Sequence, residues 1–215
     1  MRAKLVYTAI FLSLLTYYPL QAQQTTADIA LPQPSRQGGA SLLSALWQRQ
    51  SQRSFKNARL PEQILSDLLW AAGGINRPET GLKTAPSAMN AQEIAIYAAL
   101  EQGLYRYDAT THQLILILAK DMRAYAGRQD FLQQAPVCLI FVADMNRIPG
   151  DDTAAKQFYA ALDTGYISQN VYLYCAAQQL ATVAIGWVDK QALAAAMNLP
   201  QDHVVILTQP VGYPQ

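Results

Sequence analysis

Two arginines and a serine alternate at Arg49, Ser51 and Arg53, directly after an apolar segment with helical spacing. Side chains two positions apart point to the same side of an extended backbone, so two guanidinium groups and a hydroxyl would face one ligand. Guanidinium groups bind phosphate through paired, charge-assisted hydrogen bonds. The pattern predicts a site for a phosphate or a polyol phosphate, and its ordinary alternative is a solvated basic turn.

A second segment, residues 83–92 (KTAPSAMNAQ), is suited to a flat heterocyclic ring. Its small residues, among them Ser87 and Ala88, would let a ring approach the backbone. Asn90 and Gln92 carry amides, which offer both hydrogen-bond donors and acceptors to the edge of such a ring. The alternative is an ordinary helix N-cap at Ser87 or Asn90.

A third segment, residues 181–187 (ATVAIGW), combines small residues with Gly186. A glycine has no side chain to hold a ring away from the backbone, so this segment could face a planar ligand. A buried strand that ends in a turn glycine is the default interpretation.

Motifs for metal, hydrolytic or nucleotide chemistry are missing from the sequence. His112 and His203 are the only two histidines, and HExxH or CxxC spacing does not occur, which argues against a catalytic zinc. GxSxG, GxGxxG and P-loop patterns are also missing, so hydrolase, Rossmann and NTPase sites are not supported. The sequence has 16 Lys+Arg against 15 Asp+Glu in 215 residues. It therefore lacks the excess of basic residues that is typical of nucleic-acid-binding proteins.

The apolar pattern predicts one α+β domain over residues 41–215, with long helices around one sheet. The continuous apolar run 136–144 (PVCLIFVAD) is typical of a central strand covered on both faces. It contains Cys138, and Cys175 lies in an expected helix, so we expect two buried free thiols rather than a disulfide. Helices are expected near residues 41–50, 61–73, 121–134, 153–180 and 190–199, and strands near 93–100, 104–108, 112–119, 136–144, 181–189 and 203–214.

The first 22 residues have the layout of a secretory signal peptide: Arg2 and Lys4, an apolar run, and Ala22 at a small-residue cleavage site. The first cysteine is Cys138, so the lipoprotein cysteine is missing at that position. We therefore expect export, into a periplasm, without stable membrane insertion after cleavage. Residues 23–40 are polar and rich in Gln, Pro and Gly, and predict a flexible N-terminal arm.

Taken in order, these segments resemble the FMN-dependent nitroreductase superfamily. The resemblance runs from about Leu42 to Pro214. Its most specific parts are R-x-S-x-R at 49–53, LLWAAGGINRP at 68–78, TAPSAMNAQE at 84–93 and VGYP at 211–214. GLYRYD at 103–108 and APVCLIFVAD at 135–144 are also similar to that family.

The resemblance implies a nitroreductase-like α+β fold: a mostly antiparallel sheet flanked by helices, in a homodimer with FMN at the subunit interface. FMN would carry the chemistry, so no catalytic side chain is required. The helix with Asp163, Gly165, Gln169 and Asn170 would form much of the interface. The implied phosphate and ribityl contacts are Arg49, Gln50, Ser51 and Arg53, and the implied ring contacts are Pro86, Ser87, Ala88, Asn90, Ala184, Ile185 and Gly186.

The implied activity is ping-pong hydride transfer between a small-molecule donor and an electron-poor acceptor such as a nitroaromatic, quinone or enone. Reaction in the direction of substrate oxidation is equally compatible. Lys83 is a candidate for an additional phosphate-binding charge, and Gln178-Gln179-Leu180 replaces the glycine-rich turn of the family. The alternatives are a non-catalytic protein that binds flavin or another flat ligand such as a corrinoid, and a flavin-free structural dimer.

Overall fold

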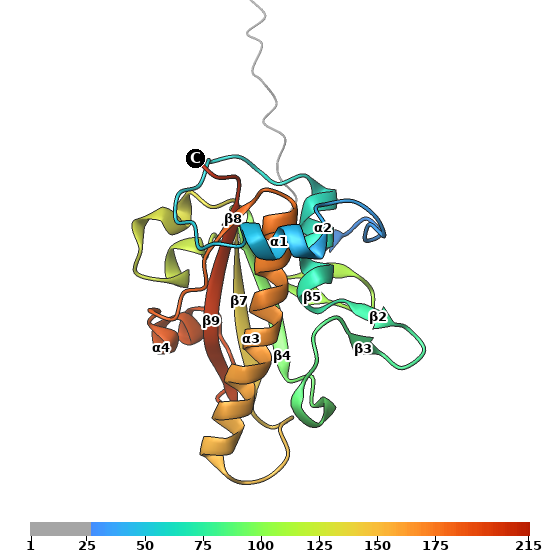
Figure 1. Cartoon of the computed structure of the whole chain (residues 1–215). Coiled ribbons are helices and arrows are strands. Elements are labelled where there is room, and N and C mark those ends of the chain that lie inside the picture. The colour runs from blue at the N-terminus through green and yellow to red at the C-terminus, as the bar shows by residue number, and fades with distance from the viewer. Residues whose placement is uncertain (1–26) are drawn as a thin grey trace, which may run out of the picture.

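The computed structural model describes residues 27–215, so the expected signal peptide lies outside the described residues. Its centre is a seven-stranded antiparallel sheet with the strand order β1-β6-β5-β4-β7-β9-β8 (Figure 1). A separate two-stranded ribbon, β2-β3, lies beside it. The strands are β1 (Ile29–Ala30), β2 (Ile75–Arg77), β3 (Leu82–Lys83), β4 (Ile94–Leu100), β5 (Gly103–Asp108), β6 (Gln113–Leu118), β7 (Val137–Asp144), β8 (Ala181–Thr182) and β9 (His203–Gly212).

Helices cover both faces of this sheet. On one face, α2 (Glu62–Gly73) and α3 (Thr153–Ala177) bury their apolar stripes, and α1 (Leu42–Gln48) lies across α3 (Figure 1). The short α4 (Lys190–Ala196) packs on the other face through Leu193. None of the helices in residues 27–215 is long and apolar enough to cross a membrane. The predicted α+β fold class is confirmed.

Strand β7 lies between β4 and β9, as its continuous apolar sequence predicted. Alternate residues point to opposite faces, so Leu139 and Phe141 join the core under α2 and α3, while Cys138 and Ile140 join the core under α4. Cys175 belongs to the first of these cores. The two cysteines are free, buried and on opposite sides of the sheet, which confirms the expectation of two separate thiols.

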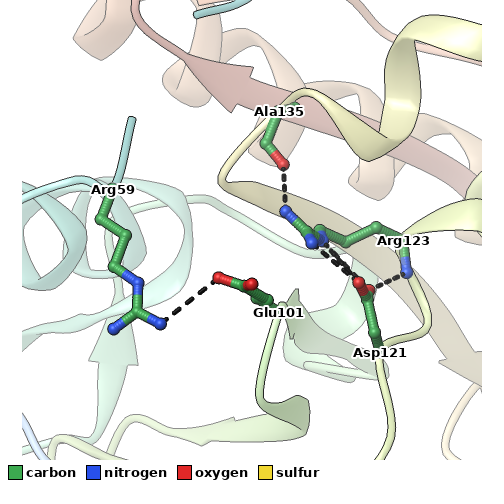
Figure 2. A network of polar contacts seen from close by, with 5 residues as sticks. All are labelled: Arg59, Glu101, Asp121, Arg123 and Ala135. Atoms are coloured by element: carbon green, nitrogen blue, oxygen red, sulfur yellow. Dashed lines mark hydrogen bonds and ion pairs between the residues drawn. The ribbon is translucent and has the colours of Figure 1, made fainter. Parts of the chain in front are cut away.

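The prediction of one helix over residues 121–134 is wrong. This stretch forms two short 3₁₀ helices, η2 (Arg123–Ala126) and η3 (Asp130–Gln133), separated by Gly127. Glycine lowers helix propensity, and the connection is fixed instead by side chains. Figure 2 shows the buried Arg123 guanidinium bound to the Asp121 carboxylate, with Nη2 to Oδ2 at 2.7 Å, and donating to the carbonyl of Ala135 at 3.1 Å.

The N-terminal arm differs from the flexible tether expected over residues 23–40. Within it, β1 pairs with β6, and the Asp28 carboxylate accepts the Leu116 N–H at 2.7 Å. Leu31 is buried in the core. The polar composition concealed this docking because a few apolar residues are enough to attach a segment to an open sheet edge.

Candidate functional site

Tyr172 of α3 connects two of the three segments that the sequence singled out. Its hydroxyl lies 2.9 Å from Ser51 Oγ and accepts the Ala184 N–H at 2.8 Å. The Arg49 guanidinium stacks over the same ring, 5.4 Å from its centroid. The Gln52 N–H also donates to the Thr182 carbonyl at 2.9 Å. The predicted phosphate segment and the 184–186 segment are therefore neighbours in space.

The exposed ends of these two segments retain free donors. Within residues 27–215, Arg53 is exposed and makes no hydrogen bond or ion pair, so its guanidinium is available to a ligand. The backbone N–H and C=O of Ile185 are hydrogen-bonded to the backbone of Thr208, and the Ala184 N–H donates to the Tyr172 hydroxyl. The Gly186 N–H has no acceptor in the described part of the chain, and the space beside the Gly186 Cα is open. Of the three ring contacts predicted in the 184–186 segment, Gly186 therefore has the available backbone donor.

A hollow of about 380 Å³ opens beside the phosphate segment. Arg49, Gln50 and Tyr172 line it, together with Thr182. Guanidinium, amide and hydroxyl groups around one hollow fit the polar and anionic parts of a ligand. In the part of the chain that is described, no group of three or more His, Cys, Asp or Glu side chains could hold a metal ion.

Residues 86–90, within the second of the predicted segments, are held in an unusual backbone conformation. Met89 and Asn90 have φ values of 53° and 52°, in the left-handed region that is uncommon outside glycine. Three hydrogen bonds fix the turn: the Asp163 carboxylate accepts the Ala88 N–H at 2.7 Å, Ser87 Oγ accepts the Gln92 N–H at 2.9 Å, and Arg147 Nε donates to the Ala91 carbonyl at 3.0 Å. Such restraint keeps the exposed Asn90 and Met89 in place despite their backbone cost.

Within one chain, the 86–90 segment does not join the other two. Figure 1 shows it on one side of α3, while the link from β8 to α4 runs on the other side. Its anchor, Asp163, precedes Tyr172 by nine positions on α3, about 13 Å along the helix axis. Pro86 and Ser87 line a different cavity of about 640 Å³, and Lys83 lines this cavity as well. Lys83 is thus not beside Arg49 and Arg53, where an additional phosphate charge was considered.

Glu93 and Asp163 form a buried carboxyl pair that the sequence analysis did not predict. Their exposed fractions are 2% and 1%. No described N–H or O–H donates to either oxygen of Glu93 or to Asp163 Oδ1. Burial, and then the neighbouring Asp163 carboxyl group, raise the pKa of Glu93 to about 7. One proton held between the two groups would satisfy both, as two adjacent carboxyl groups cannot ionise together without a large cost.

Asp163 lies on the inner face of α3, and the role of this helix in a dimer interface stays a prediction. The side chain points inward, toward Glu93 and the 86–90 segment. Gly165 and Gln169, which belong to the same expected interface helix, are exposed. Their face also carries exposed apolar side chains: Phe158, Leu162 and Tyr166.

The family model for the nitroreductase family matches residues 46–213. The chain belongs to the nitroreductase family. It is therefore a flavin-type oxidoreductase, and the recognition made from the motifs at 49–53, 68–78 and 84–93 is confirmed.

Similar proteins span nearly the whole of this nitroreductase domain. A nitroreductase structure from Ralstonia eutropha is 41% identical, with a TM-score of 0.84, over 88% of this chain and 90% of that one. A nitroreductase-like protein of Methanocaldococcus jannaschii is 29% identical over 87% of this chain and 96% of its own. A Desulfovibrio desulfuricans structure in complex with FMN shares the fold at 20% identity, with a TM-score of 0.60, over 81% and 87% of the two chains.

Three residues of this nitroreductase site were missed by sequence reasoning: Tyr172, Glu93 and Arg147. Tyr172 lies in an apolar helix among several tyrosines, so nothing local marks its hydroxyl. Glu93 precedes an apolar strand and reads as a strand boundary. Arg147 lies in a loop whose position relative to the 86–90 segment depends on sheet pairing. Only tertiary structure brings these residues to the site.

Proposed function

We propose that the protein binds FMN and transfers hydride in a ping-pong cycle between a small-molecule donor, NAD(P)H or another, and an electron-poor acceptor. Bound FMN would supply the hydride chemistry at its N5. One observation carries the proposal: the Tyr172 hydroxyl joins Ser51 to Ala184, so the predicted phosphate and ring segments form one continuous site. The FMN complex of the D. desulfuricans relative, which has the same fold, supports the cofactor.

In this proposal each segment has a distinct task. Arg49 and Arg53 bind the phosphate, since Arg53 has no competing partner and Arg49 is held over the Tyr172 ring. Gln50 and Ser51 lie beside them, within reach of the ribityl hydroxyls. The Gly186 N–H is the backbone donor toward the ring, where a donor stabilises the negative charge of the reduced flavin.

A second copy of the chain would complete the site. Pro86, Ser87, Ala88 and Asn90 lie on the other side of α3 from Gly186, so one chain does not supply both sets of ring contacts. The surface formed by α1 and α3 carries large exposed apolar side chains, which is unusual for a monomer. We therefore propose a homodimer that buries this surface, with the 86–90 segment of one subunit facing the Gly186 region of the other. The exposed side chains are Leu42, Leu43, Leu46, Trp47, Phe158, Leu162 and Tyr166.

The visible absorbance spectrum of freshly purified protein tests this proposal. Flavin maxima, with release of about one FMN per chain on denaturation, are expected from the two-site homodimer. Arg49→Ala and Arg53→Ala should each weaken FMN binding, whereas Arg128→Ala is the matched control, since Arg128 pairs with Asp189 on the surface. A colourless protein that takes up no added FMN would contradict the proposal and favour a binding or structural role.

Export is a further proposal, and it rests on residues 1–22. Fractionation of cells that express the full chain should place the processed protein in the periplasm with FMN bound. A full-length protein in the cytosol would contradict it.

A further inference from the structure

The cavity beside the 86–90 segment forms where two neighbouring strands separate. β4 and β5 pair from Leu100 and Gly103 down to Tyr97 and Arg106, and there the ladder ends. β5 continues along β6 as far as Asp108, while residues 94–96 of β4 remain paired only with β7. The open space between them is the cavity of about 640 Å³, and Pro86 and Ser87 form part of its wall. The strand pairing thus leaves a ligand-sized slot next to an expected flavin contact.

Three cationic residues line this slot, Lys83, Arg106 and Arg147, and two of them come from outside the main sheet. Lys83 comes from the β2-β3 ribbon and Arg147 from the loop after β7. Lys83 Nζ makes no hydrogen bond or ion pair within residues 27–215, and Arg147 uses only Nε, on the Ala91 carbonyl. Burial, and then the charge of Arg147, lower the pKa of Lys83. Neither cation forms an ion pair within residues 27–215, although the nearby Glu93 and Asp108 carboxyl groups partly offset the lowering of the Lys83 pKa.

The carboxyl groups around the slot form no ion pair with Lys83 or Arg147 in the described residues. Asp108 Oδ1 accepts the Thr110 N–H at 2.9 Å, and Asp144 Oδ1 accepts the Asn146 N–H at 3.1 Å. Glu93 faces Asp163, with which it can share a proton, and its oxygens are sealed from solvent. The groups that remain free to hydrogen-bond a ligand are therefore mainly the positively charged donors of Lys83 and Arg147.

We propose that Lys83 and Arg147 form an anion subsite for the substrate, which binds a carboxylate on an electron-poor aromatic or conjugated acid. The proposal rests on the proposed function, because the slot adjoins the segment expected against the flavin ring. A carboxylate between the two cations would accept the hydrogen bonds that Lys83 Nζ and the Arg147 Nη groups do not make within residues 27–215, and would orient the rest of the molecule toward residues 86–87. Charge-assisted bonds of this type are roughly twice as strong as neutral ones.

The test compares an acid with its neutral isostere on the full chain. Dissociation constants for para-nitrobenzoate and para-nitrobenzamide are measured by calorimetry, and KM values are measured for the same pair. Lys83→Gln should weaken binding of the acid by about tenfold and leave the amide within about twofold, the loss expected for one charged hydrogen bond. Arg147→Gln should give the same selective loss from the opposite wall. Lys83→Arg should retain the preference, and Lys120→Gln, on the surface beside Tyr125, is the matched loss of charge.

Three outcomes would overturn the subsite. The first is a wild type that binds acid and amide equally well, and the second is an equal loss of affinity for acid and amide in Lys83→Gln. The third is a Lys83→Gln variant that loses affinity for FMN instead of affinity for the acid. The last would assign Lys83 to the phosphate of FMN. Calorimetry requires neither flavin nor turnover. A colourless protein that prefers the acid would therefore keep the subsite and reject the oxidoreductase, whereas a yellow protein without that preference would reject the subsite alone.

Discussion

The hydroxyl groups of Ser51 and Tyr172 lie 2.9 Å apart, although 121 positions separate them in the sequence. The Tyr172 hydroxyl already accepts the Ala184 N–H, so its own proton is free to be donated to Ser51. The result is a directed chain of hydrogen bonds from the 184–186 segment, through α3, to the phosphate segment. One tyrosine on the long helix therefore sets the spacing between two parts of the proposed cofactor site.

Removing that hydroxyl should loosen both segments. In Tyr172→Phe, the half-buried Ala184 N–H loses its acceptor, which costs about 1–3 kcal/mol. We expect a lower free energy of unfolding and weaker FMN binding, measured by denaturant titration and by flavin fluorescence. Tyr125→Phe is the control, because Tyr125 is exposed and its hydroxyl contacts Lys120. Equal FMN affinity in Tyr172→Phe and the wild type would contradict the role given to Tyr172.

The carboxyl pair predicts a specific dependence of stability on pH. The pKa of Glu93 is raised to about 7 in the folded protein from its usual value of 4.5, so the folded state binds more protons than the unfolded state between these values. The contribution of Glu93 to stability is therefore fully present below pH 4.5 and is lost as the pH rises toward 7. Thermal unfolding measured from pH 4 to pH 8 should show this fall.

Glu93→Gln is the matched variant for that measurement. It keeps the shape of the side chain and cannot ionise, so the difference in stability between wild type and variant should change between about pH 4.5 and 7 and be constant above it. Parallel curves for the two proteins over the whole range would show that Glu93 titrates normally.

The apolar surface on α1 and α3 predicts how the subunits associate. Trp47 is 90% exposed, and large aromatic side chains are frequent energetic centres of interfaces. Trp47→Glu should weaken the dimer by at least about 30-fold, measured as molar mass by light scattering over a dilution series. Ile117→Glu, on β6 next to the edge strand β1, introduces the same charge elsewhere and should leave the dimer intact. A monomeric wild type would contradict the interface.

The two thiols should be unreactive in the folded protein. Burial raises the pKa of Cys138 to about 12 and also raises the pKa of Cys175, and the thiolate is the reactive form. A thiol reagent should therefore label neither residue under native conditions and both after unfolding in denaturant. Fast native labelling at either position would show that the packing around it opens readily.

Local sequence patterns predicted most of the elements because periodicity reports burial directly. The run containing Cys138 predicted β7, and the stripe from Leu65 to Leu69 predicted α2. The prediction of a helix over residues 121–134 was wrong because Gly127 and the contact of the Arg123 guanidinium with Asp121 determine the conformation of that stretch. Such a side-chain contact is visible only in the three-dimensional structure. The motifs also located the candidate segments, but sequence spacing could not reveal that α3 separates residues 86–90 from Gly186.

Both edges of the seven-stranded sheet end in strands of only two residues, β1 and β8. Short edge strands offer an incoming chain few free N–H and C=O groups, which protects a sheet protein against aggregation by strand addition. At the β1 edge this protection depends on Ile29 and Ala30 covering β6. Proteolytic loss of the chain up to Leu31 would uncover β6. The segment that carries β1 therefore protects the sheet against fibril-like assembly.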